Sequence, residues 1–165
     1  MLIQIDVLEE ASATAKHAVG DVFQDRKGGV WVYGHASGAI DQYAACTIDE
    51  AGEIAELTTT TSGAVPSAIC IPQVSMTDDY YAWAYRGSLG GSVDVDSVKV
   101  LAASNCAADV KLYTTSTAGV LDDATSSADC VLNLRLDAAQ GSGESDGVAC
   151  TAIGILTTNA QDDTL

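Results

Sequence analysis

The stretch DDYYAWAYRGSLGG, residues 78–91, decides the fold prediction because it gathers aromatic side chains in one short segment. The chain has nine aromatic residues, six Tyr, two Trp and one Phe, and four of them lie here. Side chains of a β-strand point alternately to its two faces. One face would carry Tyr81, Trp83 and Tyr85, and the other would carry Tyr80, Ala82, Ala84 and Arg86. We therefore predict a strand whose first face is a core aromatic row and whose second face, with its two alanines, admits close neighbours.

The alternative is that these rings form an exposed platform for a sugar or a base. Such platforms combine exposed rings with specific polar or cationic groups. Arg86 is the only cation in the stretch. Core and subunit packing is therefore the favoured interpretation.

The rest of the chain consists of short apolar runs separated by turn residues. Hairpins are indicated at residues 22–33, 45–57 and 109–125, each with a glycine at its turn. Two further strands flank a Gly- and Ser-rich loop at residues 140–147, and helical periodicity is confined to residues 8–18. A parallel sheet would need crossover helices, which the pattern lacks. We predict an all-β fold, a single compact antiparallel β-sandwich or barrel of about ten short strands with an N-terminal arm.

The N-terminal residues alternate in a way that predicts a strand with one apolar face. Leu2, Ile3, Ile5 and Val7 supply the apolar side chains, and they precede an Ala-rich, acidic link. This strand either belongs to its own sheet or is an arm that adds to the sheet edge of a partner. We expect an arm at residues 1–19, a β-sandwich or barrel domain at 20–157 and a polar tail at 158–165.

The charge balance argues against two classes of partner. Seven Lys and Arg face 23 Asp and Glu, which gives a formal charge of −16. Proteins that bind nucleic acid or an anionic membrane surface need clustered basic residues. The longest basic run is Arg26-Lys27. We therefore expect neither partner, and we interpret the acidic surface as a solubilising one.

The five cysteines are widely spaced and odd in number, with no C-x-x-C motif. Most stand beside small or apolar residues, where a free thiol behaves as a small hydrophobe. This pattern indicates a reducing compartment, and the acidic N-terminus lacks the basic region of a secretory signal. We expect the chain to be made in a cytoplasm.

The sequence offers no convergent set of catalytic groups. The two histidines, His17 and His35, stand outside any metal-binding motif, and no nucleophile elbow or phosphate-binding loop is present. Asp94 and Asp96 could share a cation, but the loop that would complete a calcium site is missing. We predict no enzyme activity, no catalytic residues, no metal and no cofactor.

Two stretches give the chain a resemblance to a known family. Residues 80–87, YYAWAYRG, resemble an aromatic strand that ends in glycine, and residues 112–121, LYTTSTAGVL, resemble a Leu-Tyr, Ala-Gly, Leu hairpin. Both are similar to segments of the small head decoration, or capsid cement, proteins of tailed bacteriophages, and the similarity covers roughly residues 20–157. Residues 126–147 have no counterpart in that family, and Asn105-Cys106 stands where a glycine is common.

The resemblance implies a structural role and no catalytic residues. It implies a β-rich virion protein on the outer capsid surface, commonly a homotrimer, which is assembled in the host cytoplasm and bridges subunits of the phage major capsid protein. The candidate capsid or subunit contacts are Leu2, Ile3, Ile5, Val7, Tyr80 and Arg86. The alternative function is a receptor- or carbohydrate-binding β-sandwich of the adhesin or fibre type, which would need exposed rings.

Overall fold

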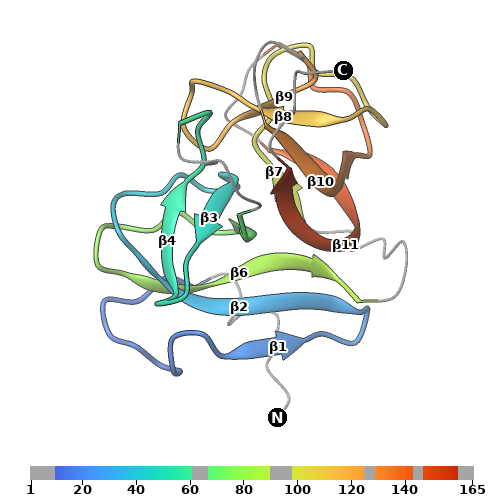
Figure 1. Ribbon diagram of the computed structural model, residues 1–165. Helices are drawn as coiled ribbons and strands as arrows, with labels where there is room; N and C mark the ends of the chain where they lie inside the picture. The colour runs from blue at the N-terminus through green and yellow to red at the C-terminus, as the bar shows by residue number, and fades with distance from the viewer. Residues whose placement is uncertain (1–9, 61–66, 90–97, 125–128, 143–146, 160–165) are drawn as a thin grey trace.

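A computed structural model describes residues 10–60, 67–89, 98–124, 129–142 and 147–159 (Figure 1). The described residues form eleven strands and no helix, so the all-β prediction is confirmed. The strands are β1 (Val22–Gln24), β2 (Gly29–Ala36), β3 (Cys46–Ile48), β4 (Glu53–Glu56), β5 (Ile69–Pro72), β6 (Tyr81–Ser88), β7 (Lys99–Val100), β8 (Leu112–Thr114), β9 (Leu121–Asp122), β10 (Cys130–Leu136) and β11 (Val148–Asn159).

All three hairpins that the glycine-containing turns predict are present. Strand β1 pairs with β2, β3 with β4, and β8 with β9, each in antiparallel register. Gly28, Gly52 and Gly119 lie between the paired strands and have positive φ, a conformation that side chains with a Cβ rarely adopt. The turn chemistry therefore explains why these three hairpins can be read from the sequence.

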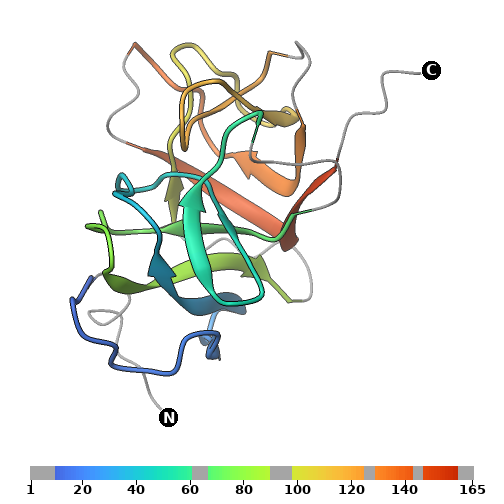
Figure 2. The same ribbon diagram turned by 60° about the vertical axis from the view of Figure 1, so that its left-hand side comes forward.

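The strands of the N-terminal half close into a five-stranded ring. Pairing runs from β2 through β4, β3, β5 and β6, and β6 returns to pair with β2 (Figures 1 and 2). All these pairs are antiparallel except β2 and β4, where His35 lies opposite Glu53 in parallel register. The sheet is therefore antiparallel, as predicted, apart from this one pair of strands. No crossover helix is needed there, because the chain returns through β3, which follows β2 in sequence and runs antiparallel to β4.

The interior of this ring explains the alanines of the aromatic strand. One buried cluster contains side chains from all five ring strands and none from β7 to β11, which places it inside the ring. Its ring-strand members are small or of medium size: Val32, Ala36, Cys46, Ile48, Ile54, Cys70, Ala82 and Ala84. A Cβ at Gly34 would come within 2.4 Å of the Ile54 side chain. The small side chains are thus required by a narrow interior.

A second layer covers one side of the ring. It comprises β7 to β11, and the long strand β11 pairs with β6 at Ile155 and Gly87 as well as with β7 and β10 (Figure 1). The larger core cluster lies between this layer and the ring, with side chains from β2, β5 and β6 meeting side chains from β7 to β11. Strand β6 therefore has ring interior on one face and interlayer core on the other.

Removing the hydroxyl of Tyr85 is predicted not to destabilise the protein, although the side chain is buried. Tyr85 is fully buried, and its hydroxyl has no hydrogen-bond partner among the described residues. Because a buried hydroxyl without a partner carries a desolvation cost, Tyr85→Phe should leave the free energy of unfolding unchanged or raise it by about 1 kcal/mol. Urea unfolding measures the change.

Tyr33→Phe is the matched control. The Tyr33 side chain is also buried, but its hydroxyl accepts a hydrogen bond from the Lys16 amide at 2.9 Å. Losing that bond should cost about 1 kcal/mol. If Tyr85→Phe destabilised the protein as much as Tyr33→Phe, the Tyr85 hydroxyl would have to be satisfied in solution.

Candidate attachment surface

The aromatic row of β6 lies in the core and not on the surface. Trp83 is 2% exposed and Tyr85 is 0% exposed, and half-buried Tyr81 packs against the same cluster. The Trp31 ring meets Tyr85 edge-on at 5.3 Å, and the Tyr33 ring lies 5.3 Å from Trp83. Offset and edge-on ring pairs of this kind add to the stability that area burial gives. The rings of Trp83 and Tyr85 are therefore not available to stack on a ligand.

Tyr80 and Arg86, the two predicted contact residues on β6 or next to it, are half-buried. An Nη1 hydrogen of Arg86 is donated to the Ile69 carbonyl at 3.1 Å, which ties β6 to β5. Burial lowers the pKa of Arg86. Among the described residues no carboxylate lies within ion-pair distance of its guanidinium, although the chain has 23 acids. Arg86 is therefore anchored to a backbone carbonyl of β5 and to no carboxylate of the described residues.

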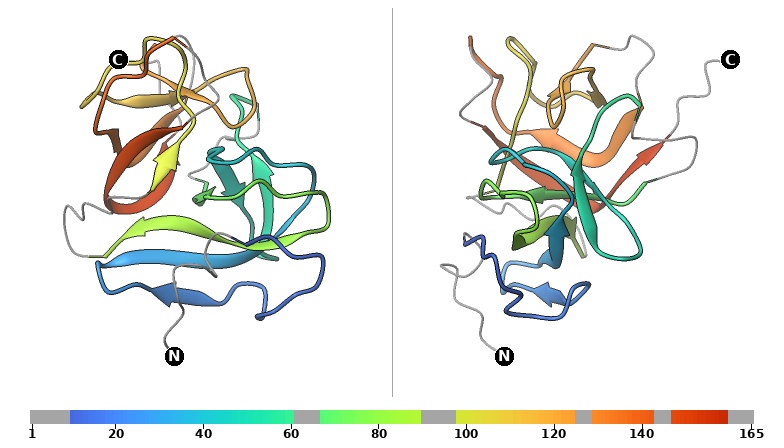
Figure 3. Two further views of the ribbon diagram at one scale, coloured as in Figure 1. Left: turned by 180° about the vertical axis from the view of Figure 1, so that it is seen from behind. Right: turned by 90° about the vertical axis from the view of Figure 1, so that its left-hand side faces the viewer.

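Residues 10–18 are fastened to the ring where β5 has ended. Ser12 and Tyr81 exchange two backbone hydrogen bonds of 2.9 Å, so Ser12 adds to the edge of β6 that β5 occupies further along. The His17 ring lies 5.1 Å from both the Tyr33 and the Trp83 ring centroids. Figure 3 shows this dark blue segment crossing close to β2 and β6 before it reaches β1. Residues 10–18 are thus held against the body at Ser12 and at His17.

The apolar residues of the predicted arm, Leu2, Ile3, Ile5 and Val7, lie outside the described residues, as do Asp94 and Asp96. His17 packs against the core aromatic residues Tyr33 and Trp83, a contact that the sequence did not reveal. Its sequence neighbours are alanine and lysine, so no local pattern could have shown that the imidazole covers the aromatic row.

Exposed apolar side chains mark a second region that the sequence did not reveal. Ile153 on β11 is 54% exposed and Leu89, just after β6, is 56% exposed. The register that pairs Ile155 with Gly87 brings these two residues to the same stretch of neighbouring strands. Leu132 on β10 is also exposed. We call Leu89 and Ile153 the apolar patch.

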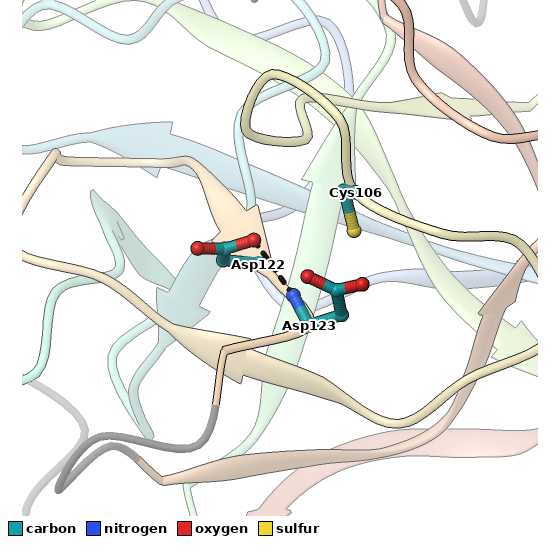
Figure 4. A group of neighbouring side chains, drawn as sticks. All are labelled: Cys106, Asp122 and Asp123. Carbon is teal, nitrogen blue, oxygen red and sulfur yellow. Dashed lines mark hydrogen bonds between the residues drawn. The ribbon is translucent and has the colours of Figure 1, made fainter.

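One cluster of acidic and sulfur ligands lies at the end of β9 (Figure 4). Ligand atoms of Cys106, Asp122 and Asp123 all lie within 4.8 Å of one another. The Asp123 carboxylate accepts a hydrogen bond from the Ala107 amide, and the Asp122 carboxylate accepts one from the Asp123 amide. Burial, together with Asp123 and Asp122, raises the pKa of the Cys106 thiol to about 11. The thiol therefore stays protonated at neutral pH. The two carboxylates accept hydrogen bonds from backbone amides and so stabilise the loops that carry them.

Comparison with protein-family models, with curated proteins and with solved structures gave no match. Within the described residues, no helix has the length and apolar character needed to cross a membrane.

Proposed function

We propose that this chain is a structural protein of a bacteriophage virion, which binds the outer surface of the capsid and bridges major capsid subunits. The observation that carries the proposal is the position of the segment that resembles the decoration family. That segment is β6, which pairs with β2, β5 and β11 and so joins the ring to the second layer. The aromatic side chains of β6 stabilise the core that joins the two layers. A rigid core of this kind suits a protein that acts by attachment.

The surface supports attachment in three ways. The net charge of −16 disfavours binding to released nucleic acid, and the apolar patch offers an uncharged area for contact with protein. Arg86 adds a cation without a carboxylate partner among the described residues. The carbohydrate-binding alternative loses its strongest feature, because Trp83 and Tyr85 are buried.

The direct test is co-sedimentation of the purified protein with capsid shells assembled without it. We expect saturable binding at a fixed number of copies per shell, and light scattering should show a trimer in solution. A monomer that stays in the supernatant and binds immobilised glycans would support the alternative instead.

The arm is tested by substitutions that separate its two faces. Replacing Ile3, Ile5 and Val7 with Ser should abolish shell binding, because an added strand needs its apolar face against the partner. Replacing Gln4 and Asp6 with Ser is the matched control and should leave binding intact. The melting temperature of both variants should equal that of the parent, because Ser12 and His17 still fasten the segment to the body. Full binding by the first variant would show that the arm is not the clamp.

A further inference from the structure

Two of the five cysteines lie directly opposite each other inside the ring. Cys46 on β3 and Cys70 on β5 are register partners in an antiparallel pair. Both are 0% exposed and belong to the cluster that fills the ring interior, so their side chains lie on the same face of the sheet. Burial raises the pKa of the Cys70 thiol to about 12. Burial, followed by the presence of Cys70, raises the pKa of Cys46 as well.

The hydrogen-bond pattern fixes the class of this pair. The Leu57 amide donates to Ala45 and the Asp49 amide donates to Glu53, so the odd-numbered residues of this segment bond toward β4. The Ile48 amide donates to Ala68 on the β5 side. Cys46 therefore bonds toward β5, and Cys46 with Cys70 is a hydrogen-bonded pair. The Cα atoms of such pairs are about 5.5 Å apart.

That Cα separation lies within the range of a disulfide, and the Cβ atoms of a hydrogen-bonded pair, about 5.5 Å apart, have to approach to about 3.8 Å for the bond to form. Cα atoms joined by a disulfide lie roughly 4.4–6.8 Å apart, most often about 5.5–6 Å. Cys106 and Cys150 belong to the other core cluster, and Cys130 is half-buried on β10, so neither Cys46 nor Cys70 has a competing partner inside the ring.

We propose that Cys46 and Cys70 are a disulfide-forming pair that locks β3 to β5 when the protein meets a small-molecule disulfide oxidant. The sulfur of one cysteine displaces one thiol from the oxidant and forms a mixed disulfide. The sulfur of the other then displaces the second thiol. One S–S bond breaks in the oxidant and one forms in the protein, and the hydrogens of the two cysteines leave on two small thiols.

Because both thiols are buried and protonated at neutral pH, the exchange proceeds through an opened state in which β3 leaves β5. We expect slow oxidation of the folded protein and fast oxidation during refolding. The bond closes a loop of about 24 residues, which should raise the melting temperature by roughly 5–10 °C.

The experiment treats the full chain with oxidised glutathione, once folded and once during refolding from urea, and then alkylates all free thiols in denaturant. Trypsin leaves Cys46 and Cys70 together in the peptide of residues 28–86, which contains no other cysteine. We expect this peptide to lose two hydrogens and escape alkylation. A glutamate-specific protease, cutting at Glu50, Glu53 or Glu56, should then give two peptides joined by the bond.

Cys46→Ala and Cys70→Ala should each abolish the cross-link and the rise in melting temperature, and Cys150→Ala, another buried cysteine, should retain both. The melting temperatures of the reduced variants and the reduced parent show any folding defect that the substitutions themselves cause, apart from the loss of the cross-link. The proposal is overturned if residues 28–86 remain fully alkylated after both treatments, or if the cross-link joins another pair.

Discussion

Gly87→Ala is expected to be among the most damaging single substitutions in the described part of the chain. Gly87 has φ +116°, and an added Cβ would meet the Gly154 carbonyl oxygen at 2.2 Å and the Ile155 Cα at 3.0 Å. Both obstacles are backbone atoms of β11, which cannot turn aside as a side chain can. The backbone strain and the separation of β6 from β11 should together cost about 3 kcal/mol or more of a total stability of about 5–15 kcal/mol. Urea unfolding measures the loss.

Substitutions at two other glycines separate the cost of backbone strain from the cost of the steric clash. Gly20 has φ +89° but nothing within 4 Å of an added Cβ, so Gly20→Ala should cost only about 1 kcal/mol. Gly38 is open and has no positive φ, so Gly38→Ala should be close to neutral. If Gly87→Ala cost no more than Gly20→Ala, the close approach of β6 and β11 would be wrong.

Trp83→Ala should destabilise the protein by about 3–5 kcal/mol, because it removes a large side chain from a packed core. Trp83 is 2% exposed, and its ring contacts Tyr33, His17 and Phe23. A cavity at this position would loosen the contact between the five-stranded ring and residues 10–18. Thermal and urea unfolding of the variant check this value.

Trp83→Phe is the informative control. The indole nitrogen of Trp83 is buried without a hydrogen-bond partner among the described residues, so the smaller ring removes an unsatisfied group along with some packing. We expect a cost of only about 1 kcal/mol. A Trp83→Ala variant as stable as Trp83→Phe would mean that the aromatic row is not part of the core.

Local turn chemistry and side-chain alternation made much of the fold predictable. The hairpin turns needed glycine at residues 28, 52 and 119, and alternation placed Trp83 and Tyr85 on one face of β6. The two alanines of β6 indicated close neighbours, which the ring interior supplies. These features depend on residues adjacent in sequence.

Features that depend on distant segments could not be read in the same way. The return pairing of β6 with β2, the parallel pair of β2 and β4, and the contact of His17 with Trp83 all join segments far apart in sequence. Ile153 has the same alternating surroundings as a core residue, yet it faces outward on β11. The apolar patch therefore became visible only when the strands were placed side by side.

Attachment of the proposed kind strengthens a shell, and heating shells with and without the protein measures this effect. A protein that binds the assembled shell and not its free subunits must shift the equilibrium toward the shell, by an amount that grows with its concentration above the dissociation constant. We predict that the disassembly temperature of shells assembled without the protein rises as the protein is added and levels off at saturation. Shells that disassemble at the same temperature at every concentration of the protein would contradict the account.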